Sequence, residues 1–127
     1  LERGLSLYPG NTKILYNLSK YYFRVNNYGK TVEYIQKYVE KDKRNKFAYY
    51  IGGAAFYQMM DYKNAIEYLE QATKIDPNFT NAYFAAGLAY KKKGAEDDAL
   101  RCFEKSLSLD PDNKYAQHEI YDLKKGQ

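Results

Sequence analysis

The fold is decided by two consecutive segments of equal length, KFAYYIGGAAFYQMMDYKNAIEYLEQATKIDPNF (46–79) and TNAYFAAGLAYKKKGAEDDALRCFEKSLSLDPDN (80–113). Written one above the other, they place chemically similar residues in the same columns. The matched pairs are Tyr49 and Tyr83, Gly53 and Gly87, Phe56 and Tyr90, Ala65 and Ala99, Leu69 and Phe103, and Pro77 and Pro111. Self-similarity at a fixed period of about 34 residues indicates a repeat protein, in which each unit covers the apolar face of its neighbour.

The same spacing organises the rest of the chain. Carried backwards and forwards from the two segments, it predicts three complete helix–turn–helix units and two partial ones. These are the tail of a preceding repeat helix over 1–9, a first unit over 12–45, a second over 46–79, a third over 80–113 and a C-terminal capping helix over 114–125. The expected fold class is therefore all-α, with helical pairs stacked in one direction.

The predicted tail over 1–9 offers Leu1, Leu5 and Leu7 as apolar contacts, and Pro9 ends it. Because Leu1 lies inside the repeat pattern, we expect the chain to be an excerpt of a longer protein. The apolar surface at this end could stack on a second copy, so self-association is one of the expected interactions.

Each complete unit is expected to hold two helices joined by a short turn. In the first unit, Leu15, Leu18 and Tyr22 recur at helical spacing and predict a helix over about 12–25, followed by a second over about 28–41. Asn and Gly tolerate the left-handed conformation that such turns require. The expected turns are Asn26–Asn27, Met60–Asp61 and Gly94.

Small residues predict where the two helices of a unit approach closely. The pairs are Gly53 and Ala65 in the second unit and Gly87 and Ala99 in the third. Gly in a helix interior costs about 1 kcal/mol relative to Ala. Its presence therefore indicates a position where the two helices touch and a larger side chain would push them apart. The first unit has Ser19 and Thr31 at these positions, and we expect looser packing there.

Charge and tyrosine are unusually distributed. The chain of 127 residues has 16 tyrosines, no tryptophan and a net charge of +4, of which residues 1–63 carry +6 and residues 64–127 carry −2. The basic half would favour acidic partners, and the alternative is an ordinary solvated helix face. The tyrosines indicate either a Tyr-lined surface or a compositional bias that raises Tyr, Lys, Asn and Ile together.

The remaining sequence signals concern the cellular compartment of the protein. Cys102 is the only cysteine, so the chain holds no internal disulfide. No apolar run approaches the roughly 20 residues that span a bilayer, and no signal peptide opens the chain. We expect a cytoplasmic protein, with targeting information upstream of Leu1 as the alternative.

The pattern resembles the tetratricopeptide repeat (TPR) family, whose units carry an aromatic residue, a Leu–Gly pair and Tyr on the first helix, then Ala, Phe and Pro on the second. The third unit matches with Tyr83, Ala86–Gly87, Tyr90, Ala99, Phe103 and Pro111, and the second with Tyr49, Gly52–Gly53, Phe56, Ala65, Leu69 and Pro77. The first unit departs most, with Leu15, Leu18–Ser19, Tyr22, Thr31, Ile35 and Lys43. The resemblance implies a right-handed α-solenoid of helix-turn-helix repeats with a concave groove.

Family members are mostly scaffolds that hold a peptide or a helix in that groove, which is lined by the free face of the first helices. The positions that match are Lys13, Tyr16, Asn17, Lys20, Phe23, Arg24, Phe47, Tyr50, Ile51, Ala54, Tyr57, Asn81, Phe84, Ala85, Leu88, Lys91 and Lys92, followed by Tyr115 and His118. This groove is expected to be apolar and aromatic in its middle and basic at both ends, which suits an acidic or aromatic-rich ligand. The alternative is that several of these rings pack against the neighbouring unit.

One subclass of the family clamps the terminal carboxylates of chaperones with Lys and Asn side chains. The matching positions here are Tyr16, Lys20, Ile51, Asn81 and Ala85. Only Lys20 is basic, so no chaperone-tail clamp is expected.

Catalytic and cofactor sites are not expected. His118 is the only histidine, and no nucleophile has a base at helical spacing. Gly52–Gly53 lies within a helical pattern and follows no strand, so it is not a phosphate loop. The sequence therefore favours a non-catalytic protein–protein interaction scaffold without cofactor, metal or membrane insertion. Nucleic acid is not the expected partner. The alternatives are an RNA-binding helical repeat or the non-catalytic arm of a larger enzyme or assembly factor.

Overall fold

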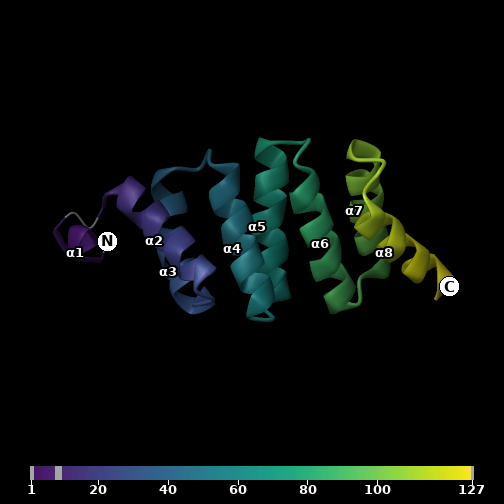
Figure 1. Ribbon diagram of the computed structural model, residues 1–127, viewed down its shortest axis with the longest axis horizontal. Helices are drawn as coiled ribbons and strands as arrows, with labels where there is room; N and C mark the ends of the chain where they lie inside the picture. Colours follow the sequence, from purple (N-terminus) through teal and green to yellow (C-terminus); the bar gives the residue numbers. More distant parts are fainter. Residues whose placement is uncertain (1, 8–9, 127) are drawn as a thin grey trace.

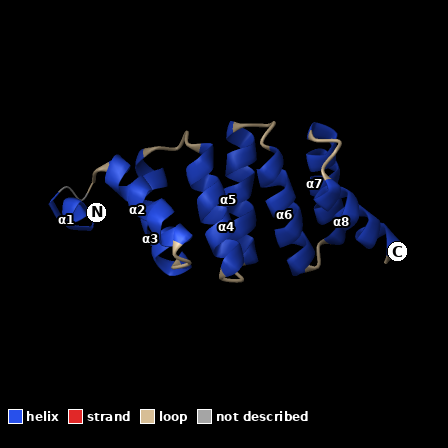
Figure 2. Cartoon of the chain, viewed as in Figure 1, coloured by secondary structure: helices blue, strands red, loops and turns tan. Residues whose placement is uncertain are grey.

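The structure is a computed structural model that describes residues 2–7 and 10–126, with the side chains of 5–7 excepted. This part of the chain consists of helices and turns, without strands (Figures 1 and 2). The helices are α1 (Glu2–Leu7), α2 (Thr12–Arg24), α3 (Tyr28–Lys41), α4 (Lys46–Gln58), α5 (Tyr62–Ile75), α6 (Thr80–Lys93), α7 (Glu96–Leu109) and α8 (Lys114–Lys125). The predicted all-α class is confirmed. The expected contacts of Leu1, Leu5, Leu7 and Pro9 lie outside the described residues and side chains.

The helices form an elongated row with the two termini at opposite ends (Figure 1). Helices α2, α4, α6 and α8 begin 34 residues apart, at Thr12, Lys46, Thr80 and Lys114. Each helix packs on the next, and α4 also contacts α2 and α6. The first helices α2, α4 and α6 therefore lie side by side and share one face of the stack.

Left-handed residues close the turns between paired helices. Asn26 has φ 63°, Met60 has φ 61° and Gly94 has φ 83°. The next residue in two of these turns caps the following helix, because Asn27 accepts a hydrogen bond from the Lys30 N–H and Asp61 accepts one from the Asn64 N–H. The chain reverses direction within two or three residues at each turn, which keeps paired helices antiparallel.

The core is a series of linked clusters along the stack. One joins α2, α3 and α4 around Leu15, Leu18 and Ile35, and another joins α4, α5 and α6 around Tyr49 and Leu69. At the C-terminal end, the buried cluster consists of Ala99, Phe103 and Leu123. Burial between successive helices is how a repeat protein stabilises itself without one central core.

Two glycines allow close helix crossings, and one of them faces a residue other than the one expected. A Cβ on Gly53 would lie 2.7 Å from Leu69 Cγ and 3.2 Å from the carbonyl oxygen of Ala65. A Cβ on Gly87 would lie 2.6 Å from Cε1 of Phe103, so the ring of Phe103, not Ala99, requires this glycine. Since real Cβ atoms do not approach other atoms this closely, both positions exclude a larger residue unless the neighbour moves.

Gly52 allows close packing both within its own pair and against the preceding pair. A Cβ there would lie 2.7 Å from Tyr68 Cδ2 and 2.9 Å from Ile35 Cγ2, on α5 and α3 respectively. The sequence pattern pointed to Gly53 for packing within the pair and assigned no separate role to Gly52.

Candidate partner-binding groove

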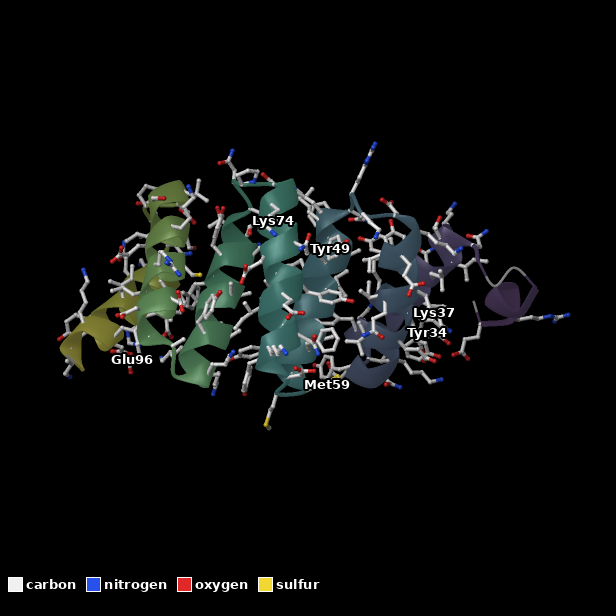
Figure 3. All side chains as sticks on the ribbon, turned by 180° about the vertical axis from the view of Figure 1, so that it is seen from behind. Tyr34, Lys37, Tyr49, Met59, Lys74 and Glu96 are labelled. Atoms are coloured by element: carbon white, nitrogen blue, oxygen red, sulfur yellow. The ribbon has the colours of Figure 1, made fainter. Side chains whose placement is uncertain are left out.

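The predicted groove residues lie on the shared face of α2, α4 and α6, and all keep some solvent exposure. Six of the fourteen principal positions are exposed: Lys13, Lys20, Arg24, Phe47, Asn81 and Lys91. The other eight are half-buried: Tyr16, Asn17, Phe23, Tyr50, Ile51, Tyr57, Phe84 and Leu88. The opposite side of the stack, where Lys37 and Lys74 project from α3 and α5, is seen in Figure 3.

Exposed cations mark the N-terminal end of this face. Lys13, Lys20 and Arg24 are exposed on α2. The Lys20 ammonium lies 4.5 Å from the centre of the Tyr16 ring, one helical turn away. Tyr16 in turn packs against Tyr38 of α3, with ring centres 5.1 Å apart. Packing against Tyr38 therefore fixes the Tyr16 ring, and the Lys20 ammonium lies over that ring.

Aromatic rings form the middle of the face. The ring of Phe79, which immediately precedes α6, lies 5.7 Å from Phe47 and 5.3 Å from Tyr50. Lys46 holds its ammonium 5.1 Å from the Phe47 ring and 5.2 Å from the Phe79 ring and pairs with Asp76. The hydrogen bond from Lys46 holds the pKa of Asp76 below its usual value. Burial raises the pKa of Tyr50.

Phe84 and Leu88 have a partly structural role. Phe84 lies 5.5 Å from the buried ring of Phe103, and both residues pack against the cluster around Ala99. The sequence alone leaves open whether such rings face the groove or pack against the neighbouring unit. Phe84 and Leu88 do the second in part, because each is half-buried.

At the C-terminal end of this face, which we expected to be basic, Lys91 is paired with an acidic residue. Its ammonium lies 2.7 Å from a carboxylate oxygen of Glu119 on α8, and this hydrogen bond raises the pKa of Lys91. The exposed residues His118 and Asp122 of α8 form a second pair, 3.2 Å apart. The face therefore runs from cationic on α2, through aromatic on α4, to mixed charge beside α8.

Two residues of this face were missing from the sequence-based set. Phe79 and Lys46 lie at the start of first helices, just outside the columns that the repeat alignment assigned to the groove. Phe79 could have been found by comparing helix starts, because the equivalent residue of α2, α4 and α8 is Asn.

The chaperone-clamp positions carry little positive charge. Of these five positions only Lys20 is basic, and its ammonium lies over the Tyr16 ring. Ile51 and Ala85 are half-buried and apolar. The absence of a carboxylate clamp stays a prediction.

Over residues 2–7 and 10–126, no group of three His, Cys, Asp or Glu side chains is placed to hold a metal ion. None of the helices in this part of the chain is both long and apolar enough to cross a membrane. Cys102 is half-buried, and burial raises the pKa of its thiol to about 11.

Comparison with known proteins identifies this class of fold. Two profiles match the sequence, one described as TPR repeat over residues 53–94 and one described as Tetratricopeptide repeat over residues 80–113. Two crystal structures of MamA match with TM-scores of 0.96 and 0.93 at 29% and 30% identity. They cover 98% and 96% of this chain, which spans 73% and 67% of the matched MamA chains. Comparison with curated proteins gives no match.

The chain belongs to the tetratricopeptide repeat family, and its fold is the right-handed α-solenoid of that family. A further similar structure is the first TPR of Spaghetti (RPAP3) bound to an HSP90 peptide, with a TM-score of 0.85 and 20% identity over 91% of each chain. At that identity the likeness concerns the fold. The family and fold expected from the sequence are confirmed.

Proposed function

We propose that this chain is a non-catalytic scaffold that holds a peptide or a helix of a partner protein against the face of α2, α4 and α6. One observation carries the proposal: the first helices keep large apolar and aromatic side chains partly exposed on a single face. Phe47 is 53% exposed, and Tyr50, Ile51 and Tyr57 beside it on α4 are half-buried. Clustered aromatic rings of this kind are the usual anchors of protein interfaces.

The charge distribution supports an acidic partner. Lys13, Lys20 and Arg24 line the N-terminal end of the face, and the first half of the chain carries a net +6. Positive potential beside an apolar surface steers acidic segments towards it and fixes their orientation. The similar RPAP3 repeat domain, whose structure contains an HSP90 peptide, is an example of a peptide ligand on this fold.

A pull-down with three groove rings removed tests the proposal. The triple variant Tyr50→Ala, Tyr57→Ala, Phe84→Ala removes aromatic contact area from α4 and α6. We expect a protein that the wild-type chain retains to be lost from this variant, since hot-spot rings each contribute about 2 kcal/mol or more to binding. The matched control removes Tyr21 and Tyr121, which are 46% and 64% exposed and lie outside the groove positions.

The control variant should retain the partner, and thermal melting followed by circular dichroism should show that the triple variant still folds. A folded triple variant that keeps all its partners would overturn the proposal. Binding of single-stranded RNA, weakening steeply as salt increases, would replace it with the nucleic-acid alternative.

A further inference from the structure

Three of the four first helices begin in the same way. Asn11, Asn45 and Asn113 directly precede α2, α4 and α8, and each side-chain oxygen accepts backbone hydrogen bonds from the first turn. The distance from Asn11 Oδ1 to the Ile14 nitrogen is 3.0 Å, and Asn45 and Asn113 each accept two bonds of 3.0–3.2 Å. This arrangement satisfies N–H groups that the helix itself leaves without partners.

Helix α6 departs from this arrangement. The equivalent residue is Phe79, 34 residues after Asn45, and a phenyl ring has no atom that can accept these bonds. Asn is among the residues most favoured at this position and large apolar residues among the least. Helix α6 therefore lacks the stabilising side-chain cap that Asn provides for α2, α4 and α8.

The Phe79 ring is used on the groove face instead. Together with Phe47 and Tyr50 it forms a group that we call the aromatic pad. The centre of the Phe79 ring lies 5.7 Å from that of Phe47 and 5.3 Å from that of Tyr50. Part of Phe79 also packs on the cluster around Tyr49 and Leu69, which fixes the ring's position. The Lys46 ammonium lies 5.1 Å from the Phe47 ring and 5.2 Å from the Phe79 ring, and Phe47 still remains 53% exposed.

A hollow of about 540 Å³ adjoins the pad. Its lining comprises Arg44, Asn45, Lys46, Phe47, Ile75 and Asp76. Ile75 is exposed and lines the hollow, which gives it a second apolar side chain beside Phe47. Arg44 lines the hollow and is exposed, and its neighbour Lys43 in the segment that leads into α4 is exposed as well.

We propose that Phe79, Phe47 and Tyr50 form a specificity subsite that takes one apolar side chain of an acidic segment of the partner protein. The inference rests on the proposed function and names the chemistry of its ligand. The apolar side chain lies on the rings, and the acidic residues that precede or follow it face Lys43 and Arg44. Apolar contact gives the anchor, while the exposed cations favour a negatively charged flank over a neutral or basic one.

Selection of peptides on two forms of the chain tests the subsite. A displayed library of random dodecapeptides is panned in parallel on the wild type and on Phe79→Asn, which restores the cap found on α2, α4 and α8. We expect the wild type to enrich peptides with a Leu, Phe or Trp beside Asp or Glu. Synthesised copies of these peptides should bind Phe79→Asn at least about tenfold more weakly, by fluorescence anisotropy.

Three further variants separate binding from folding. Phe79→Ala removes the ring without adding a cap and should lose binding to the same degree. Tyr121→Ala removes a ring that is 64% exposed on α8 and lies outside the groove positions, and it should bind as the wild type does. Lys43→Glu with Arg44→Glu should weaken binding most at low salt, because exposed charges are screened as salt rises.

The outcomes distinguish this subsite from the groove as a whole. If the enriched peptides bind Phe79→Asn as tightly as the wild type but are lost from Tyr57→Ala, Phe84→Ala, groove binding stands and the subsite is refuted. Peptides without an apolar residue beside acidic ones also refute the subsite. If no peptide is enriched, or neither variant affects binding, both proposals fail. Sedimentation at several concentrations checks whether a second copy of the chain occupies the pad instead.

Discussion

The first and third helical pairs solve the same packing problem with different residues. In the α6–α7 pair, Gly87 leaves room for the fully buried ring of Phe103. In the α2–α3 pair, the equivalent residues are Ser19 and Ile35, and both are also fully buried. A larger residue on the first helix is matched by a smaller one on the second, so the volume at the crossing is conserved while its chemistry changes.

The polar residues of the first pair are satisfied within the fold. The Ser19 hydroxyl donates to the Leu15 carbonyl oxygen at 2.7 Å, and the Thr31 hydroxyl donates to the Asn27 carbonyl oxygen at 2.9 Å. Complete burial with these hydrogen bonds argues against a cavity at this crossing, although we expected looser packing there. Substitutions at the two crossings can therefore test whether both are packed equally tightly.

The largest effect is expected from Phe103→Ala. Removing a fully buried ring leaves a cavity beside Gly87 and should lower the free energy of unfolding by about 3–5 kcal/mol. Ile35→Ala, the matched change in the first pair, removes fewer atoms and should cost less. Urea denaturation followed by circular dichroism measures both. A larger loss from Ile35→Ala would show that the first crossing, not the third, is the more tightly packed.

Gly87→Leu should destabilise the third pair by overpacking, with a loss of about 1–3 kcal/mol and a melting temperature several degrees lower. Gly87→Ser alone should also destabilise it. Adding Phe103→Ile to Gly87→Ser reproduces the residues of the first pair and should recover part of the loss. Failure of the second change to recover any stability would contradict the exchange of volume between the two helices.

The turns offer a smaller test of the same comparison. Met60 adopts φ 61° in the second pair, where Gly94 adopts φ 83° in the third. A residue with a side chain is strained in this region by roughly 1–2 kcal/mol, and glycine adopts it without strain but loses more chain entropy. We therefore expect Met60→Gly to raise stability by about 0.5–1 kcal/mol and Gly94→Met to lower it. Thermal melting of both variants measures the two shifts, and shifts in the same direction would contradict this.

The smallest effect concerns a position where the third pair differs from the other two. Cys102 stands where the first and second pairs have Tyr34 and Tyr68. With its pKa raised from 9.0 to about 11, the thiol should hold about 100-fold less thiolate near neutral pH than it does in the unfolded chain. Alkylation by iodoacetamide at pH 7 should slow by a similar factor on folding and speed up as pH rises towards 11. Equal rates in native and urea-unfolded protein would contradict the burial of this thiol.

Part of the candidate site could be predicted in the same way as the helices. The resemblance to the TPR family, mapped onto the 34-residue columns, selected Tyr16, Phe47 and Tyr50. It missed Phe79, whose role depends on a ring meeting two others across a helix boundary. It also gave no indication that Lys91 is paired, since the partner Glu119 is 28 residues away on another helix.

Periodicity was sufficient to establish the all-α repeat architecture, the turns and the family of this chain, because each of these follows from local conformational preference and from apolar residues recurring at one spacing. The tertiary structure alone revealed which side chain each glycine accommodates, which cation is paired and which rings form the aromatic pad. Those outcomes depend on distances between residues 16 to 32 positions apart, and the spacing of residue types along a chain does not contain such distances.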